Sequence, residues 1–211
     1  MKLNKIIPSI VFLLVLSSCI ETVILGSATT FGVMNSEKSV HDFANDISVK
    51  NDLQKRVKMS DQKRIFNDVN IDVMENRIML TGSITEERYR KVIIKMMWDN
   101  KNVKEVIDEI LIVEKSEKRN KIKDKLITDQ IDTKYKVKRN IKSLNYKVRT
   151  VDSTVYILGI AQSIKELSVT ARVASQTKGA KKVVSHVILK EDSRREEENS
   201  SSDKEIIQGD L

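Results

Sequence analysis

The chain has 211 residues, of which 32% are charged, 40% hydrophobic and only 4% aromatic, so one large domain or two small ones can form. The only proline, Pro8, excludes the proline-rich and collagen-like classes. The only cysteine, Cys19, excludes an intrachain disulfide and a cysteine-based zinc site, and two histidines leave little material for a catalytic triad. We therefore expect no metal, no cofactor and no catalytic residues.

The first 18 residues have the layout of a secretory signal peptide, with Lys2 and Lys5 ahead of an apolar run of 11 residues. The segment Leu16-Ser17-Ser18-Cys19 then resembles the lipobox of bacterial lipoproteins. This resemblance implies that Cys19 is acylated, for example with palmitate, and becomes the first mature residue. The alternative is an ordinary cysteine behind an uncleaved leader. Glu21 argues against that alternative because it places a charge where a continuing membrane helix needs apolar residues.

The residue after the cysteine is Ile20 and not aspartate. In the lipoproteins that the lipobox resembles, an aspartate at that position favours retention in the inner membrane. The resemblance therefore implies a lipid anchor in the outer membrane with the chain facing the periplasm, and an inner-membrane anchor is the alternative. Residues 19–45 are expected to be a flexible tether.

Beyond residue 45 the sequence repeats itself with an offset of 77 residues. Gly82 falls on Gly159, and apolar positions such as Ile71 and Val148 coincide without a gap. Only six glycines occur in the chain, and two of them match in this way. The sequence therefore predicts two copies of one module.

Each copy contains alternating apolar residues typical of a hairpin, followed by helical spacing and a last apolar strand. The first copy is predicted to contain a helix from near Asp46, strands at 69–73 and 78–84 joined at Glu75-Asn76, a helix from Thr85-Glu86-Glu87 to Asn102, and a strand over 106–113. The second is predicted to contain a helix from near Asp124, strands at 146–148 and 155–161 joined at Asp152-Ser153, a helix from Ser163 to Gly179, and a strand over 183–189. Ser163 and Glu166 have the spacing of a capping box, and Thr85-Glu86-Glu87 is predicted to be a cap followed by an acidic first turn. Asparagine and glycine tolerate the left-handed conformation that ends a helix.

This order and three of its motifs resemble the BON domain (bacterial OsmY and nodulation). The motifs are Asp124-Lys-Leu-Ile127, the pair Ile78-Met-Leu-Thr-Gly82 and Val155-Tyr-Ile-Leu-Gly159, and Gly179-Ala-Lys-Lys-Val183-Val184. The second copy fits closely, whereas the first has Asn102 in place of the last glycine. A lipobox with two such copies is similar to the dual-BON outer-membrane lipoproteins of the DolP (YraP) group.

The resemblance implies an α+β fold with two tandem αββαβ domains, each a three-stranded mixed sheet packed on two helices. The expected segments are a signal peptide (1–18), a lipidated tether (19–45), BON domain 1 (46–113), a linker (114–123), BON domain 2 (124–190) and a disordered acidic tail (191–211). We expect Gly82, Gly159 and Gly179 to be structural. For Gly82 and Gly159 the expected reason is a helix that packs too close to the strand for a side chain. Trp98 is expected in a helix core, and His186 at the surface.

Positive charge is concentrated in the second copy. Residues 124–190 carry 14 basic and 5 acidic side chains, a net charge of +9, whereas residues 46–113 carry 13 and 12. A basic surface suits nucleic acid, anionic lipid or an acidic partner, and export excludes nucleic acid as a routine ligand. Of these ligands, anionic phospholipid best fits a protein that is tethered to a membrane. The alternative is that the basic surface is solvated and serves only solubility.

The BON resemblance further implies that the second copy contacts anionic phospholipid, such as phosphatidylglycerol or cardiolipin, through its first helix. Carried onto this chain, the contact residues are Leu126 and Ile127, with Leu126 where the family has an aromatic residue. Charge adds four candidates for phospholipid binding, which are Lys134, Lys138, Arg139 and Lys142.

The resulting expectation is a non-enzymatic, periplasm-facing lipoprotein that supports the integrity of the outer membrane and cell envelope. The alternative is a protein–protein adaptor that docks on an envelope assembly or secretion complex. An enzyme is disfavoured because no nucleophile, base and orienting group can be named together.

Overall fold

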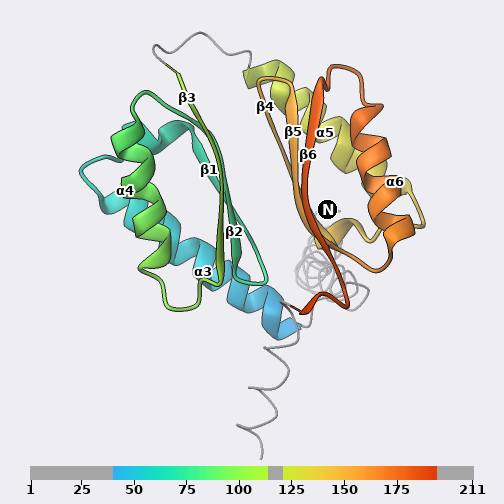
Figure 1. Cartoon of the computed structure of the whole chain (residues 1–211), viewed down its shortest axis with the longest axis horizontal. Helices are drawn as coiled ribbons and strands as arrows, with labels where there is room; N and C mark the ends of the chain where they lie inside the picture. Colours follow the sequence, from blue (N-terminus) through green and yellow to red (C-terminus); the bar gives the residue numbers. More distant parts are fainter. Residues whose placement is uncertain (1–39, 114–120, 194–211) are drawn as a thin grey trace, which may run out of the picture.

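The computed structural model describes residues 40–113 and 121–193, which form two modules (Figure 1). Module one, residues 40–113, contains α3 (Val40–Met59), the 3-10 turn η1 (Ile65–Asp68), β1 (Val69–Met74), β2 (Arg77–Ile84), α4 (Glu87–Trp98) and β3 (Glu105–Ile112). Module two, residues 121–193, contains α5 (Lys121–Val137), η2 (Ser143–Asn145), β4 (Tyr146–Val151), β5 (Thr154–Ala161), α6 (Ile164–Ser175) and β6 (Lys182–Leu189). The predicted order of helices and strands is confirmed in both.

Each module has one three-stranded mixed sheet. In module one β1 pairs antiparallel with β2, and β2 pairs parallel with β3; β4, β5 and β6 repeat this arrangement in module two. The register is also repeated, with Ile71 opposite Leu80 and Val148 opposite Ile157. Both hairpins therefore turn at the predicted dipeptides.

The hairpin turns adopt a backbone that most residues avoid. Glu75 and Asn76 have φ of 49° and 60°, and Asp152 and Ser153 have 48° and 62°. Two consecutive residues with positive φ are characteristic of the type I′ turn, whose twist matches that of the paired strands.

The aspartates predicted to open the first helices have a different role. α3 begins at Val40 and α5 at Lys121, so residues 40–45, expected in the tether, and 121–123, expected in the linker, are helical. Asp124 accepts hydrogen bonds of 2.9 Å from the backbone N–H groups of Asp152 and Ser153. Asp46 likewise accepts from the two turn residues of module one, at 3.0 and 3.1 Å. Each carboxylate fastens its helix to the hairpin turn and satisfies two buried amides.

The reason given above for the hairpin glycines is wrong. A Cβ on Gly82 would lie 1.9 Å from the carbonyl oxygen of Asp68, and one on Gly159 would lie 2.8 Å from that of Asn145. The close neighbour is thus the chain that enters β1 or β4, and not a helix. Gly82 also has a φ of +117°, which favours glycine independently of space.

The second helices end earlier than predicted. α4 ends at Trp98 and α6 at Ser175, four residues before Asn102 and Gly179. Gly179 does adopt a positive φ of +97°, and a Cβ there would lie 3.0 Å from Ile127. The glycine serves the turn into β6 and its packing on α5, and so it does not mark the helix end. Asn102 does not share this conformation.

The two predicted caps differ in outcome. Ser163 accepts a hydrogen bond of 3.2 Å from the N–H of Glu166, which confirms that half of the capping box. The Glu166 carboxylate reaches the N–H groups of Gln162 and Lys142 at 2.9 and 2.8 Å, so it also holds the loop after α5. In module one the N-cap is Glu86 and makes no side-chain capping bond, and the cap expected from Thr85 is therefore wrong.

Each module buries its own apolar core between its helices and one face of its sheet. The largest fully buried side chains include Leu53 and Ile93 in module one, and Ile131 and Tyr135 in module two. Trp98, expected in a core, is 51% exposed at the end of α4, so that prediction is wrong.

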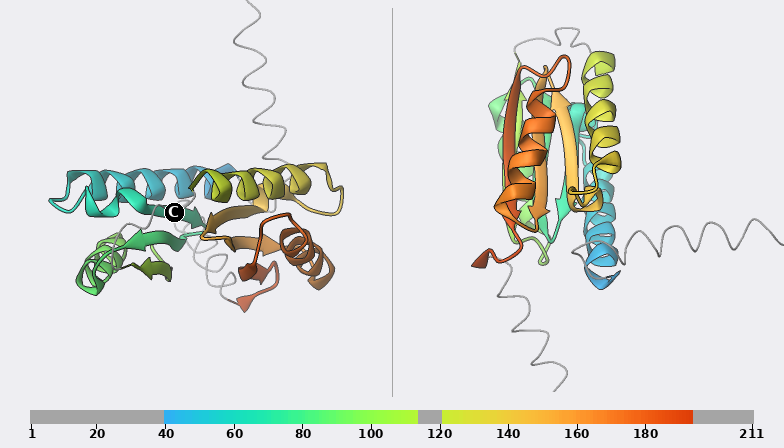
Figure 2. Two further views of the ribbon diagram at one scale, coloured as in Figure 1. Left: turned by 90° about the horizontal axis from the view of Figure 1, so that it is seen from above. Right: turned by 90° about the vertical axis from the view of Figure 1, so that its right-hand side faces the viewer.

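The other face of each sheet meets its counterpart. Figure 1 shows the two sheets facing each other at the centre, with helices on both outer sides. In Figure 2, α3 and α5 lie in one layer along one face of the molecule, whereas α4 and α6 lie toward the opposite face. Every residue of β2, and all but the first of β5, is buried, because helices cover one side of these strands and the other module covers the second.

Candidate functional site: the seam between the modules and the exposed face of α5

An apolar cluster joins the two modules, and we call this interface the seam. Its buried members are Met74, Met79, Ile107, Val151, Tyr156, Leu158, Ile160 and Ile188. Residues of both sheets contribute to it, so the modules pack as one body in which neither sheet leaves a broad apolar face in solvent.

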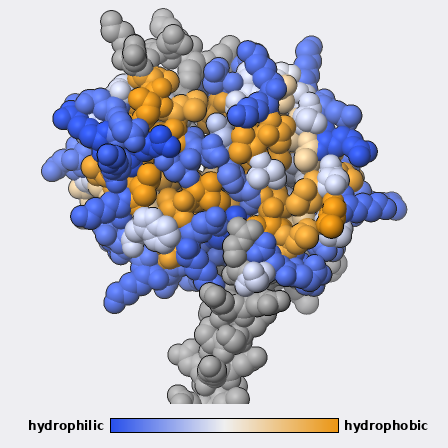
Figure 3. Space-filling view, viewed as in Figure 1, coloured by the Kyte–Doolittle hydropathy of each residue, from blue (hydrophilic) through white to orange (hydrophobic). Residues whose placement is uncertain are grey.

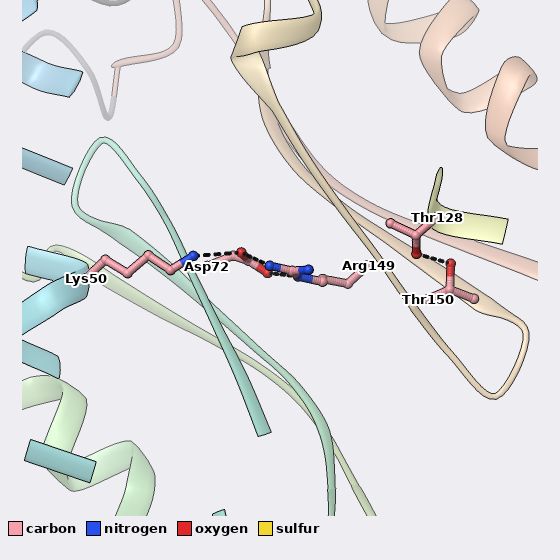
Figure 4. A network of polar contacts seen from close by, with 5 residues as sticks. All are labelled: Lys50, Asp72, Thr128, Arg149 and Thr150. Atoms are coloured by element: carbon pink, nitrogen blue, oxygen red, sulfur yellow. Dashed lines mark hydrogen bonds and ion pairs between the residues drawn. The ribbon is translucent and has the colours of Figure 1, made fainter. Parts of the chain in front are cut away.

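Two of the polar pairs that join the modules connect residues that are one repeat offset, 77 positions, apart. Arg149 donates two hydrogen bonds to Asp72, at 2.6 and 2.8 Å (Figure 4). His186 Nε2 lies 2.8 Å from Glu109 Oε1. Because 77 is also the offset of the repeat, each residue meets its own counterpart. Counterparts meet in this way only close to a twofold axis, so the modules are related by a pseudo-twofold rotation through these two pairs.

Asp72 is the most deeply buried charge at the seam, with a side-chain exposure of 1%. Burial opposes ionisation of the carboxyl, but the hydrogen bonds from Arg149 and the nearby Lys50 outweigh it, and the pKa of Asp72 is lowered. The same bonds raise the pKa of Arg149. Lys50 Nζ lies 3.4 Å from Asp72, so one carboxylate serves a cation from each module.

A second cation bridges the modules on the side of the edge strands. Arg77 donates to Glu105 at 2.5 Å within module one and to the backbone carbonyl of His186 at 3.2 Å in module two. A bridging guanidinium is suited to this position because it presents several donors in a fixed plane.

The residues predicted to touch phospholipid do not share one environment. Leu126 is 55% exposed on α5, whereas Ile127 is 2% exposed and packs in the core of module two. Lys134 donates a hydrogen bond of 2.9 Å to Thr177 of its own module. Only Leu126 of these three points to solvent, so Ile127 and Lys134 position α5 and do not contribute to its outer surface.

The basic residues after α5 also differ in their exposure to solvent. Lys138 and Arg139 are exposed, whereas Lys142 is half-buried where its backbone N–H donates to Glu166. The exposed pair directly follows the end of α5, the helix on whose outer surface Leu126 lies.

The sequence-based reasoning missed two apolar residues on this surface. Ile122 is 76% exposed and Val137 is 73% exposed. They lie four residues before and eleven residues after Leu126, spacings that place all three on one side of a helix. The helical spacing of these apolar residues was visible in the sequence, but such a stripe normally marks the side of a helix that packs in the core. In α5 the buried side carries Asp124 and Ile127 instead.

Cys19, the predicted acylation site, lies outside the described residues. Within residues 40–113 and 121–193, none of the helices combines the length and the apolar character that crossing a bilayer requires. The same residues contain no group of histidine, cysteine and carboxylate side chains arranged to hold a metal ion. His186, expected at the surface, is half-buried in the seam.

Comparisons with known proteins find several similar chains. The chain is 35% identical over 130 residues to an uncharacterized protein in the gshII 5′ region of Anaplasma centrale, an alignment covering 61% of this chain and 86% of that protein. It is 24% identical over 170 residues to the outer membrane lipoprotein DolP of Haemophilus influenzae, covering 80% and 87%. The C-terminal domain of CdsD, the structural protein of the type III secretion system of Chlamydia trachomatis, matches at 10% identity and a TM-score of 0.27, covering 83% of this chain and 74% of that one. That TM-score is too low to bear on function.

The family model named BON domain matches the chain twice, at residues 45–114 and 123–191. These two matches contain all the strands of both sheets, the whole of α4 and α6, and all but the first residues of α3 and α5. The chain therefore belongs to the BON-domain family, with two copies of the domain joined at a pseudo-symmetric seam.

Proposed function

We propose that this protein is a non-enzymatic lipoprotein of the cell envelope, anchored through Cys19 in the outer membrane and facing the periplasm. Its second BON module contacts anionic phospholipid and thereby supports envelope integrity. The observation that carries the proposal is the outer side of α5, where Ile122, Leu126 and Val137 are 76%, 55% and 73% exposed. The likeness to DolP of Haemophilus influenzae, an outer membrane lipoprotein, supports the location.

A helix that lies on a membrane needs apolar side chains at its outer side and cations beside them. The apolar residues of α5 meet the first requirement, and Lys138 and Arg139 meet the second. Each cation near an anionic surface contributes about 1 kcal/mol, so the contact is weak alone. The acyl anchor compensates, because it holds the module at a high effective concentration near the membrane.

The test is flotation of residues 20–211, which lack the acylated Cys19, on vesicles of phosphatidylglycerol or of phosphatidylcholine across a range of salt. Module two alone is unsuitable, because its half of the seam, including Tyr156 and Leu158, would be exposed and would bind any lipid. We expect salt-sensitive binding to phosphatidylglycerol only.

Two variants separate the contributions to this binding. Leu126→Gln removes an apolar contact at constant charge, and the double change Lys138→Glu with Arg139→Glu reverses the exposed cations. Both should weaken flotation severalfold. The matched control reverses the exposed Lys91 and Lys101 of module one and should float like the parent chain. Equal binding to neutral vesicles, or equal loss in the control, would contradict the proposal.

A protein–protein adaptor is the second candidate, and the opposite face of the molecule favours it. Figure 3 shows that hydrophobic residues gather there in two areas with hydrophilic residues between them. Ile112, at the end of the edge strand β3, is 41% exposed. Exposed apolar areas of this kind suit a protein partner. Site-specific crosslinking in cells from Ile112 distinguishes the adaptor from the phospholipid-binding protein, since a protein that binds only phospholipid yields no specific protein adduct from this position.

A further inference from the structure

A groove of about 340 Å³ lies beside α3 in module one, where the end of the helix, η1 and the start of β1 meet. Module two contributes Arg149 to its wall. The groove is therefore complete only when the modules are joined at the seam. Its size is within the range of sites that bind small molecules.

Four cations line this groove, and they are Lys50, Lys58, Lys63 and Arg149. No carboxylate is among the residues that line it. Module one as a whole is nearly neutral, with 13 basic and 12 acidic side chains in residues 46–113, so this concentration of one sign is local. A concave surface with one sign of charge focuses the field and attracts a ligand of the opposite sign.

Two of the four cations of the groove are unpaired, and the other two share the carboxylate of Asp72. Lys58 and Lys63 are exposed, and neither forms an ion pair with another described residue. Lys50 reaches Asp72 only at 3.4 Å and keeps 32% of its side chain exposed. Arg149 holds Asp72 bidentately, so it is fixed in place at the groove wall (Figure 4).

A neighbouring groove provides an internal contrast. It measures about 350 Å³, lies beside α5 and also includes Arg149. There Lys121 pairs with Asp68, and Lys125 pairs with Asp129 at 2.6 Å, so its lysines are neutralised by carboxylates. The two grooves are thus similar in size, and among the described residues only the one beside α3 has lysines without an ion pair, namely Lys58 and Lys63.

Neutral donors complete the chemistry. The exposed side chains of Asn67 and Asn70 line the same groove. Their amide groups donate hydrogen bonds without adding charge, and ammonium groups bind phosphate as point charges. Phosphate oxygens are the acceptors that fit several lysines and two amides at one position.

We propose that this groove is a binding site for a phosphate group, either free phosphate or the phosphodiester of a lipid headgroup. The site belongs to module one and the seam, and it is separate from the outer side of α5. It does not depend on the membrane contact proposed above, because soluble phosphate compounds test it.

The experiment is a titration of isotope-labelled residues 20–211 with inorganic phosphate and with glycerophosphoglycerol at constant ionic strength. Backbone amide shifts of Val57 and Phe66, which line this groove and not the neighbouring one, report binding. We expect saturable shifts that chloride at equal ionic strength does not produce. Saturation by inorganic phosphate identifies free phosphate as the ligand, and saturation by glycerophosphoglycerol alone identifies a lipid headgroup; both outcomes support a phosphate site.

The decisive variant carries Lys58→Glu and Lys63→Glu, both at exposed positions without ion pairs. Binding should weaken by about tenfold or more, because two charges beside the phosphate are reversed. The control carries Lys91→Glu on α4 and Lys101→Glu in the loop after it, so it has the same net charge as the decisive variant. It should bind phosphate like the parent chain. Amide spectra of both variants report whether they are folded.

Absence of saturable shifts, or equal weakening in the variant and the control, would overturn the site. The membrane contact of α5 fails on a different measurement, namely unchanged flotation of Leu126→Gln. The two proposals can therefore be rejected independently.

Discussion

The two modules share one plan and differ most where they touch. Both fasten their hairpin turn with an aspartate from the first helix, and both keep a glycine against the chain that enters the sheet. At the seam, by contrast, Asp72 faces Arg149 and Glu109 faces His186. Positions that are equivalent in the repeat thus carry complementary groups.

This difference shows what a tandem repeat permits that a homodimer does not. In a symmetric dimer of identical modules, a residue on the twofold axis meets its own copy, and two aspartates or two arginines would repel. In one chain the two positions are coded separately, so opposite charges can be placed there. The seam is therefore specific for the pairing of module one with module two, because each module paired with itself would bring like charges together.

The largest expected effect comes from breaking the pair at the seam. Arg149→Ala leaves the buried carboxylate of Asp72 with only the distant Lys50, and we expect a loss of about 3–5 kcal/mol in the free energy of unfolding. Urea denaturation measures it. The double variant with Asp72→Ala should recover part of the loss, since no buried charge remains. A double variant less stable than Arg149→Ala would argue against the pair.

The next largest effect is the loss of stability on replacing the equivalent glycines of the two modules by alanine. Gly82→Ala places a Cβ against a backbone carbonyl at a φ of +117°, and we expect a loss of about 3 kcal/mol. Gly159→Ala meets the Tyr146 ring at 2.5 Å and a backbone oxygen at 2.8 Å without a positive φ, so about 1–2 kcal/mol is expected. Urea denaturation of both variants gives the order, and equal losses would show that φ contributes nothing.

The seam should also weaken in acid. The pKa of Asp72 lies below its ordinary value of 3.8 in the folded chain. Its contribution to stability is therefore fully present above about pH 4 and is lost as the pH falls through the lowered value. Unfolding free energies of the parent and Asp72→Asn should differ at pH 7 and converge as the pH falls below 4. A constant difference would contradict the linkage.

The smallest expected effect is a gain. Thr81 occupies the position in module one that the buried Leu158 occupies in module two. Its buried hydroxyl has no hydrogen-bond partner among the described residues. Thr81→Val keeps the shape and removes the unpaired group, which should stabilise the chain by about 1 kcal/mol. Thermal unfolding would show a rise in Tm of a few degrees. A lower Tm would show that the hydroxyl makes a bond to water.

The candidate site was only partly accessible from sequence. The BON resemblance placed Leu126 and Ile127 on the first helix of module two, but adjacent residues of a helix point in different directions. Only the packing of Ile127 against Gly179 shows which one is buried. Lys134 and Lys138 are both basic in the sequence, yet one is tied to Thr177 and the other is free at the surface. A count of charges cannot make that distinction, because it does not show where each side chain points.

The sequence by itself determined the repeat, the order of the elements and the hairpin turns, because these depend on local periodicity and on the backbone preferences of single residues. The alternation read in β5 predicted one buried face, whereas the structure buries both faces of this strand. Only the tertiary structure decided that the second face of each sheet meets the other module. Contacts such as Asp72 with Arg149 join residues 77 positions apart, and no local pattern specifies which distant residue a charge will meet.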